Sequence, residues 1–498
     1  MSYLLGVDIG TSSAKSLLMD EEGRPVGTAQ RMYDIIKKKE QYAEQDMEQL
    51  WQAAADTIAE LSHRYPDKIR DLAGIGFSGQ MHGLVMVGHD GRPVRPAIIW
   101  ADQRSGDAID EIYHIIPKEE YQSIALNALS TGFLVSSLVW VRDQEPENYS
   151  KTWKVMLPKD YIRYRMTGEI GTDYSDASST AIFDTVREDW AFGLIDRLGL
   201  DKEKFVSCHA SSEPAGSVTK DCAERTGIPA GTPVVYGGGD TIVQAVGNGL
   251  AGSGTLISNI GTASQLLLVS DEPLHDPYYR TNTFSYARKG SWLLMGANIS
   301  GGIALKWFRN SMMAGSSYED LTKEALTARP GCSGLLFLPY LSGERTPWND
   351  PMAKGIFWGL DLPTTRADMI RAVMEGIIYS QRASLEIFRG MGIKYHQVIA
   401  SGGGARGSLF RQLMADMFDT EVRTSLVEEQ GCTGAAMLAG IGSGIYRDLK
   451  DASDRVVHFS DRVTEPVPAN TAFYAERYEL FKEIYPANRE LFQKNRAR

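Results

Sequence analysis

Apolar positions along the chain repeat with two periods that alternate from one segment to the next. Residues 4–7 and 14–19 are short apolar runs near the start, and the turn-forming residues Glu21-Glu22-Gly23 follow them. Runs of this length predict the strands of a hairpin. Further along, apolar residues four, four and three positions apart predict one buried face of a helix; they are Leu50, Ala54, Ile58 and Leu61.

The alternation of strand and helix patterns continues beyond this first helix. Residues 67–79 pass from a polar turn into the strand-like LAGIGFSG, and residues 107–116 have a helical pattern. Alternating patterns of this kind are typical of an α/β fold. No proline-rich or low-complexity linker interrupts the chain. Any domain boundary is therefore expected to be a short crossover between packed domains.

A weak internal repeat divides the chain near its middle. The stretch VDIGTSSAK at 7–15 is similar to SNIGTASQL at 258–266. Each passes from a strand-like run through Ile-Gly-Thr into a second strand-like run. Two glycine clusters also follow strand-like runs, PVVYGGGD at 233–240 and QVIASGGGA at 397–405. The repeat predicts a duplicated architecture, with a domain boundary close to 249–254.

Glycine turns of this kind suit the binding of phosphate. A phosphate needs several backbone N–H groups aimed at one point and no side chain in the way, and glycine supplies both. A single such turn is weak evidence, but two matching turns and two further glycine clusters in one chain strengthen the prediction. We expect two domains whose turns face each other across the phosphates of a nucleotide.

Two acidic residues next to these turns have two interpretations each. Asp8 ends the first strand and either caps a turn or helps to hold a hydrated magnesium ion. Asp240 follows three glycines and is either a helix N-cap or a general base that takes a proton from an attacking hydroxyl. Lys15 is interpreted as a solvated strand residue.

Composition narrows the class of protein. The 498 residues are enough for two to four domains of about 100–200 residues each. The net charge of −11 argues against a nucleic-acid partner and against an anionic membrane surface. The four cysteines form no CxxC pair and are expected to be buried and reduced. Without a signal-peptide pattern or 18 successive apolar residues, a cytoplasmic protein is expected.

Longer stretches resemble the FGGY family of carbohydrate kinases from Tyr3 to about Gly444. Residues 355–376, GIFWGLDLPTTRADMIRAVMEG, are similar to the family's C-terminal signature throughout. The other matching stretches are SGQMHG at 78–83, IIWADQRS at 98–105, LPKDYIRYRMTGE at 157–169, SDASST at 175–180, GGGD at 237–240 and FLPYLSGERTPWNDP at 337–351. The resemblance implies a duplicated actin-like ATPase (ribonuclease H-like) α/β fold with two domains around a central cleft. It assigns sugar binding to residues 1–250 and nucleotide binding to residues 251–498.

The resemblance also implies roles for single residues. Asp240 matches the catalytic base, and Asp8 matches an acid that acts on the metal and the phosphates. The residues implied to contact the sugar are Met81, His82, Trp100, Asp102, Arg104 and Asp240. Those implied to contact the nucleotide are Thr11, Ser12, Gly261, Thr262, Gly403, Gly404, Ala405 and Ser408. Taken by itself, His82 is more simply explained as a core histidine with satisfied hydrogen bonds.

The chain departs from the family pattern at several positions. Ser136-Ser137 stand where relatives often carry Pro-Lys, Tyr286 stands where a histidine is common, and Ala101 replaces an asparagine. After Gly403 and Gly404, which match the family's adenosine-binding glycines, Gly407-Ser408 stand where relatives have a serine and a larger polar residue. The first three departures bear on the choice of sugar, and the last bears on adenine affinity.

The matching stretches are most similar to family members that phosphorylate D-xylulose to D-xylulose 5-phosphate. ATP and Mg²⁺ are therefore the expected cofactors, and a small sugar is the expected partner. The alternatives are another acceptor (ribulose, a tetrulose, gluconate or glycerol) or a non-catalytic sugar or nucleotide sensor. Whether the protein forms a homodimer is left open by the sequence.

Overall fold

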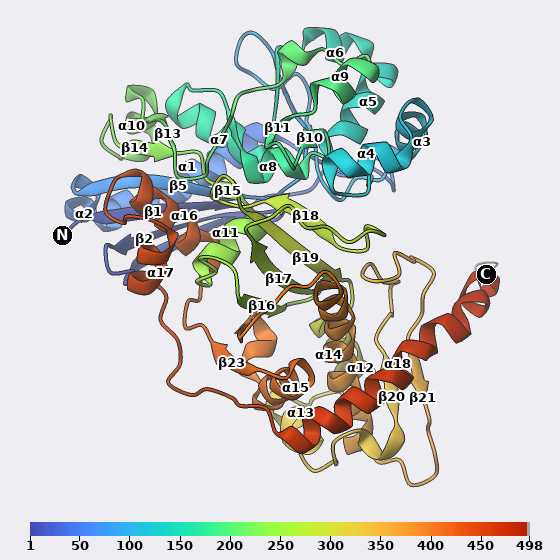
Figure 1. The fold of residues 1–498 in the computed structure, drawn as a ribbon. Helices are drawn as coiled ribbons and strands as arrows, with labels where there is room; N and C mark the ends of the chain where they lie inside the picture. The colour runs from blue at the N-terminus through green and yellow to red at the C-terminus, as the bar shows by residue number, and fades with distance from the viewer. Residues whose placement is uncertain (496–498) are drawn as a thin grey trace.

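The computed structural model describes residues 1–495 and contains two mixed β-sheets (Figure 1). The strands of the first sheet, in spatial order, are β13 (Pro214–Ser217), β14 (Pro233–Val235), β5 (Leu72–Gly79), β1 (Tyr3–Ile9), β2 (Ser13–Asp20) and β3 (Pro25–Met32), and β15 (Gly238–Gly239) also pairs with β5. Those of the second are β18 (Asn282–Ser285), β19 (Trp292–Asn298), β17 (Ser264–Ser270), β16 (Thr255–Ile260), β22 (Gln397–Ser401) and β23 (Glu421–Thr424).

The two sheets repeat one topology. In the first, β1 forms an antiparallel hairpin with β2 and pairs in parallel with β5. In the second, β16 forms an antiparallel hairpin with β17 and pairs in parallel with β22. Each Ile-Gly-Thr turn connects the strands of its hairpin, so the internal repeat predicted from the sequence is confirmed.

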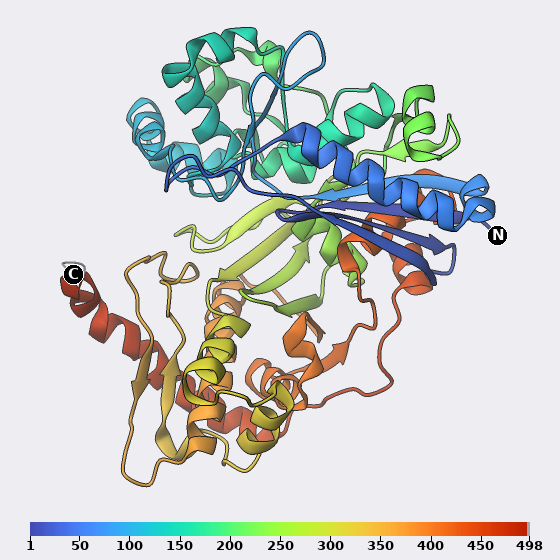
Figure 2. The same cartoon turned by 180° about the vertical axis from the view of Figure 1, so that it is seen from behind.

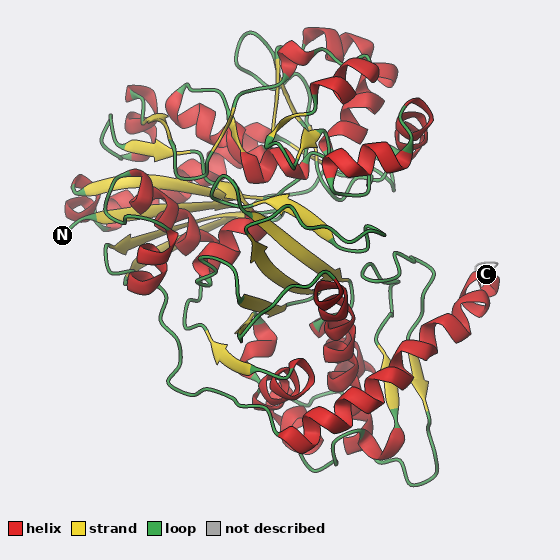
Figure 3. Ribbon diagram, viewed as in Figure 1, coloured by secondary structure: helices red, strands yellow, loops and turns green. Residues whose placement is uncertain are grey.

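Two helices lie between the sheets and form the central layer of the molecule (Figures 1 and 3). They are α11 (Asp240–Gly247) and α16 (Gln430–Gly442), and their apolar residues share one core cluster with residues of both sheets. The other face of the first sheet is covered by α1 (Met47–Arg64), which crosses it in the rear view (Figure 2), together with α7 (Pro158–Thr167) and α10 (Lys220–Thr226). The outer face of the second sheet packs against α14 (Arg366–Gly390) and α15 (Ser408–Phe418).

The helix α16 approaches the first sheet so closely that only glycine fits beneath it. A Cβ at Gly6 would lie 1.8 Å from the carbonyl oxygen of Cys432, and one at Gly76 would lie 1.9 Å from that of Ala435. On its other flank, a Cβ at Gly434 would lie 2.0 Å from the carbonyl oxygen of Val243 in α11. Backbone therefore contacts backbone on two sides of this helix.

The predicted first helix is confirmed in α1. Its side chains at Leu50, Ala54, Ile58 and Leu61 are all fully buried. Asp46 caps the helix by accepting a hydrogen bond from the backbone N–H of Glu48, which satisfies one of the free donors of the first turn. The polar turn expected before β5 is instead the short helix α2 (Pro66–Arg70), which begins with proline because that residue suits a first helical position.

The segment between β5 and β14 adds a helical layer with its own core. Its helices are α3 (Gly106–Ile115), α4 (Lys118–Ala125), α5 (Leu134–Gln144), α6 (Pro146–Lys151), α8 (Tyr174–Ser179) and α9 (Phe192–Arg197), so the helix predicted at 107–116 is confirmed. Its short strands are β6 (Val85–Val87), β7 (Ala97–Ile98), β8 (Lys154–Met156), β9 (Thr172–Asp173), β10 (Phe183–Asp184), β11 (Asp189–Trp190) and β12 (Cys208–His209), and β7 pairs with β4 (Glu44–Gln45).

The remaining elements surround the second sheet. They are α12 (Gly302–Met312), α13 (Tyr318–Ala325), β20 (Leu336–Leu338), β21 (Ile356–Trp358) and the long C-terminal helix α18 (Pro468–Lys494). One further helix, α17 (Leu449–Val456), packs instead against α16 and α11, beside the first sheet (Figure 1). Within residues 1–495, no helix has the length and apolar character needed to cross a membrane. All four cysteines are free; three are buried and Cys208 is partly exposed.

Candidate active site

Asp8 and Asp240 come together because three parallel strands end at the same edge of the first sheet. Asp8 on β1 lies opposite Ser78 on β5, and Ser78 lies opposite Gly238 on β15, two residues before Asp240. The Ser78 hydroxyl donates a hydrogen bond of 2.6 Å to Asp8 Oδ1. Gly237 makes the sharp turn into β15 with φ of 75°, where an added Cβ would lie 2.2 Å from the carbonyl oxygen of Phe77.

The environment of Asp240 suits a general base. Burial and, to a smaller extent, the negative charge of Asp8 together raise the pKa of its carboxyl group to about 7, against the lowering effect of hydrogen bonds from Thr241. Burial also raises the pKa of Asp8, although the Ser78 hydrogen bond and Lys15 oppose the increase. A base with a pKa near the working pH can take a proton and still be largely ionised beforehand.

Side chains hold the first Ile-Gly-Thr turn in place by donating hydrogen bonds to its backbone carbonyl oxygens. Gln45 Nε2 donates to the carbonyl oxygen of Thr11 at 2.7 Å, and Tyr33 donates its hydroxyl to that of Gly10. Gln80 joins Gln45 through a 2.6 Å hydrogen bond. Because the carbonyl groups are engaged on one side, the turn is fixed in one conformation. The exposed Ser12 lies at its tip.

The second Ile-Gly-Thr turn is part of a cluster of three glycine turns. Gly302 and Ile303 donate their backbone N–H groups to the carbonyl oxygens of Gly261 and Thr262. In the turn that follows the neighbouring strand β22, a Cβ at Gly404 would lie 2.7 Å from the side chain of Ile260. The predicted nucleotide residues of this half therefore gather at the ends of β16 and β22, with Gly403, Gly404 and Ala405 in a 3₁₀ turn and Ser408 at the start of α15.

The turn formed by NISGG at 298–302 was missed in the sequence. It follows β19 and begins α12, and it packs on the second Ile-Gly-Thr turn. The signal was available, because this stretch also places glycines between a strand and a helix.

The N-terminus of α16 links Asp8 to the nucleotide cluster. A Cβ at Gly431 would lie 3.3 Å from the carboxyl carbon of Asp8, and Gln430 accepts a hydrogen bond from Ser401, the last residue of β22. Lys15 forms a 2.7 Å ion pair with Glu429 directly before this helix. The interpretation of Lys15 as a solvated residue is therefore wrong, since its side chain is only 27% exposed and its partner lies 414 positions away.

His82 is held in one orientation and is neutral. Its ring nitrogen Nδ1 lies 2.7 Å from the carbonyl oxygen of Ser179, and its ring stacks on Phe133 with centroids 4.2 Å apart. A carbonyl can only accept, so Nδ1 carries the proton and Nε2 is left as an acceptor. Burial lowers the pKa of the imidazole to about 4. Met81 beside it packs against Gly239, where an added Cβ would lie 2.7 Å from Met81 Cγ.

Of the three residues predicted from the loop at 98–105, one is exposed and the other two form a buried pair. Trp100 is 43% exposed and donates its indole N–H to Thr11 Oγ1 at 2.9 Å. Asp102 and Arg104 are buried and bind each other through several hydrogen bonds, and Arg104 also forms an ion pair with Glu44. Contact with the sugar stays a prediction for all three, but Asp102 and Arg104 already have internal partners.

Two departures from the family pattern are buried away from solvent. Tyr286 donates its hydroxyl to the carbonyl oxygen of Leu250, in the crossover between the two sheets, and is 1% exposed. Ser136 and Ser137 are fully buried on α5. For Tyr286, the hydrogen bond shows an anchor for the crossover rather than a side chain aimed at a ligand.

The residues present fit a magnesium ion bound together with phosphates. Mg²⁺ is usually held by one or two carboxylates, several waters and substrate phosphates rather than by a protein cage. Asp8 provides such a carboxylate beside the first Ile-Gly-Thr turn, and Asp240 lies close enough for their charges to interact. Within residues 1–495 there is no cluster of three or more acidic, histidine or cysteine side chains that would form such a cage.

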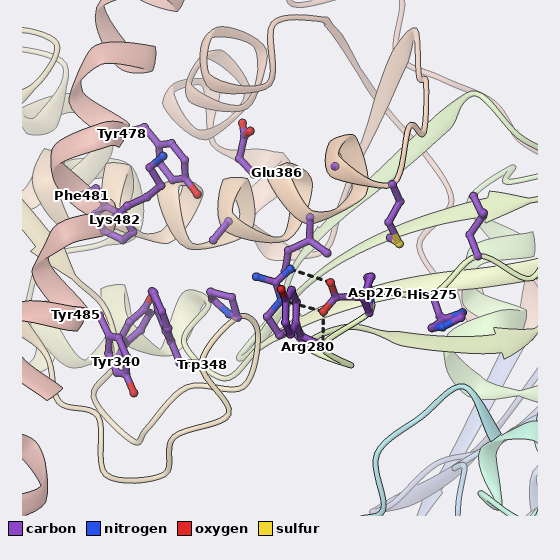
Figure 4. Close-up of a pocket in the computed structure, with 18 residues that line it drawn as sticks. His275, Asp276, Arg280, Tyr340, Trp348, Glu386, Tyr478, Phe481, Lys482 and Tyr485 are labelled. Carbon is purple, nitrogen blue, oxygen red and sulfur yellow. Dashed lines mark hydrogen bonds and ion pairs between the residues drawn. The ribbon is translucent and has the colours of Figure 1, made fainter. Parts of the chain in front are cut away.

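A cavity of about 680 Å³ lies outside this constellation, between α14 and α18 (Figure 4). Each helix contributes residues at positions i, i+3, i+4 and i+7: Ala383, Glu386, Ile387 and Gly390 from α14, and Tyr478, Phe481, Lys482 and Tyr485 from α18. None of the residues predicted from the sequence to bind sugar or nucleotide lines it.

Replacing Gly261 tests the second turn. A Cβ at Gly261 would meet only one atom within 4 Å, the carbonyl oxygen of Ala263 at 3.8 Å, so Gly261→Val is expected to fold. The added side chain would extend from the turn where phosphate is expected to approach the backbone. We expect affinity for ATP, measured by isothermal titration calorimetry, to fall at least about tenfold, since loss of a charge-assisted hydrogen bond costs 1.5–3 kcal/mol. Unchanged ATP affinity would remove Gly261 from the phosphate site.

Comparison with known proteins agrees with this geometry. Residues 3–247 match the N-terminal domain, and residues 256–443 the C-terminal domain, of the FGGY family of carbohydrate kinases. The chain is 33% identical to a xylulose kinase of Staphylococcus xylosus (97% of this chain, all of the relative) and 34% identical to that of Bacillus subtilis (99% and 98%). It is 30% identical to a gluconokinase of Bacillus subtilis, over 91% of this chain and 90% of that relative.

Solved structures agree as well. A xylulose kinase from Brucella ovis superposes with a TM-score of 0.91 at 31% identity, covering 98% of this chain and all of that one. A ligand-bound xylulose kinase from Lactobacillus acidophilus superposes with a TM-score of 0.93 at 28% identity, covering 99% and 100%. The expected duplicated actin-like fold is thereby confirmed, and the chain belongs to the FGGY family of carbohydrate kinases.

Proposed function

We propose that the protein phosphorylates D-xylulose at O5, with ATP as phosphoryl donor. The observation that carries the proposal is the pairing of Asp8 with Asp240, whose pKa is raised to about 7, next to a neutral histidine and two phosphate-type turns. The relatives described as xylulose kinases supply the choice of sugar. The need for ATP favours action in the cytoplasm.

In this proposal the sugar binds next to Met81 and His82, and the nucleotide binds to the turns of the second sheet. The sugar O5 attacks the γ-phosphorus, the bond from that phosphorus to the β,γ-bridging oxygen breaks, and ADP leaves. Asp240 takes the proton of O5 during the attack. When bound, Mg²⁺ neutralises charge on the phosphates, and Asp8 would hold it. Trp100 donates its indole N–H to Thr11 and so holds that side chain of the first turn in place.

His82 provides a test of the sugar site. Its Nε2 can accept a hydrogen bond from a sugar hydroxyl, and removing one partner strands that hydroxyl in a closed site. We expect His82→Ala to lower kcat/KM for the true acceptor about tenfold or more, because 1.4 kcal/mol corresponds to a factor of ten. ATP hydrolysis without sugar should change little, since water does not use that contact.

A panel of acceptors identifies the sugar and supplies the control for this variant. Coupled detection of ADP with D-xylulose, ribulose, gluconate and glycerol should give the highest kcat/KM for D-xylulose. The gluconokinase relative makes gluconate the second candidate. A higher kcat/KM for gluconate or glycerol than for D-xylulose would reject the xylulose assignment but not the assignment as a kinase. A protein that turns over none of them and binds ATP would be a sensor instead.

A further inference from the structure

The loop between β20 and β21 carries Arg345 on a rigid support. Glu344 and Asp350 exchange two backbone hydrogen bonds of 2.9 and 2.8 Å across the loop. Next to Arg345, the backbone N–H of Thr346 donates to the carbonyl oxygen of Ala297. The side-chain amide of Asn298 donates to the carbonyl oxygen of Thr346. These hydrogen bonds therefore fix the segment 344–346 to the end of β19.

This support continues directly into the nucleotide cluster. The buried carboxylate of Glu344 accepts the backbone N–H of Ile299 at 2.6 Å and that of Arg345 at 2.8 Å. Ile299 opens the turn that packs on Gly261 and Thr262. Burial raises the pKa of Glu344 to about 7, and its carboxylate accepts hydrogen bonds from these two backbone groups and from the Ser380 hydroxyl. The backbone of Arg345 is thus fixed beside the turns expected to hold the phosphates.

The strands that carry this support also reach the sugar residues of the first half of the chain, because the His82 ring lies 5.9 Å from that of Phe284 on β18, which pairs with β19. The charge of Arg345 is close enough to His82 to lower the pKa of that imidazole, in addition to the effect of burial. The Arg345 side chain is exposed. Within residues 1–495 the Arg345 guanidinium has no hydrogen bond or ion pair. Three other arginines of the second half, Arg280, Arg371 and Arg389, each form an ion pair with an acidic side chain.

An unpaired guanidinium between a phosphate turn and a sugar site suits one particular anion. The ketose is neutral and so is His82, so neither calls for a positive charge. The group that passes between the two sites is the phosphoryl group, whose oxygens carry negative charge throughout the transfer. A guanidinium can bind two of those oxygens at once.

We propose that Arg345 is a catalytic residue that binds the phosphoryl group while it passes from the nucleotide to the sugar. The proposal rests on the proposed kinase reaction but not on the identity of the sugar. Arg345 is supplied by the nucleotide side and would stabilise the charge on the transferred oxygens, in the manner of an electrostatic clamp. The sequence contained the residue in FLPYLSGERTPWNDP, but nothing in that pattern gave it a role.

Arg345→Ala is tested with whichever acceptor gives the highest rate in the panel, so that a wrong sugar assignment does not affect the result. We expect kcat to fall by about 10²–10³, the effect of removing one donor to a developing negative charge, while KM for the sugar and affinity for ADP stay within about threefold. Aluminium fluoride with ADP and sugar, a mimic of the phosphoryl group in transfer, should bind at least about tenfold more weakly to the variant.

The matched control is Arg309→Ala, which removes a partly exposed arginine of the same half, on α12, whose guanidinium donates to its neighbour Asn310 and lies over the ring of Tyr318. It should leave kcat and fluoride binding unchanged. Added guanidinium chloride at low millimolar concentration should partly restore kcat of Arg345→Ala. Should Arg345→Ala fail to fold by circular dichroism, Arg345→Lys is measured in its place and should retain charge but lose part of kcat. An unchanged kcat, or a raised KM for the sugar at full kcat, would overturn the proposal.

Discussion

Asp240→Asn should lower kcat by about 10²–10⁴ while leaving the binding of sugar and ATP nearly intact, because the amide keeps the shape of the carboxylate but cannot accept the proton. Steady-state kinetics and calorimetric titration of both substrates measure the two effects. The matched control is Asp67→Asn on α2, whose carboxyl group is 89% exposed and far from this chemistry. Near-normal turnover by Asp240→Asn would remove it from the role of base.

The raised pKa of Asp240 adds a pH dependence to this prediction. The carboxyl group is protonated below about pH 7, so kcat/KM of the parent should fall as the pH drops through 7. The folded pKa lies above the ordinary value of 3.8, so ionisation destabilises the fold as the pH rises. Asp240→Asn should therefore raise Tm at pH 8 and have a smaller effect at pH 5. An equal change in Tm at both values would contradict the shift.

Gly76→Ala should destabilise the protein by about 3 kcal/mol or more, or prevent it from folding. The added methyl group would lie 1.9 Å from the carbonyl oxygen of Ala435, so α16 must move away from the sheet. Urea unfolding followed by circular dichroism, with the yield of soluble protein, measures the effect.

Gly252→Ala is the control for this glycine prediction. A Cβ at Gly252 would meet nothing within 4 Å, and its φ lies outside the left-handed region. Its unfolding midpoint should match that of the parent or rise slightly, since alanine restricts the unfolded chain. If Gly76→Ala were as stable as this control, α16 would not rest on the sheet as closely as the structure has it.

The parts of the site that could be predicted are those whose signal is local. Each Ile-Gly-Thr turn has strand patterns within a few residues on both sides, so both the hairpin and its turn could be predicted. The position of Asp240 after three glycines predicted a strand end leading into a helix, which is what β15 and α11 form. Local patterns of this kind specify the geometry without distant partners.

The parts that could not be predicted depend on contacts across the chain. Lys15 looked solvated because its acid partner, Glu429, comes 414 positions later. The four charged residues Lys159, Asp160, Asp173 and Asp176 are fully buried as one cluster beneath Gly239, although charged residues are rarely buried. Arg345 lies in a stretch of strong resemblance, but only its backbone position beside the turns of the second sheet and its unpaired guanidinium indicate a role.

The return of α16 to the first sheet has a consequence for how the protein is synthesised. The strands β1 and β5 leave the ribosome early, but the helix that fills the groove above their glycines is made only when the chain reaches residue 442. Until then one apolar face of the nascent sheet lacks part of its cover and is open to chaperones. A fragment that ends near residue 250 would keep Met81, His82 and Asp240 but would carry that exposed face permanently, so such a fragment should aggregate rather than bind sugar.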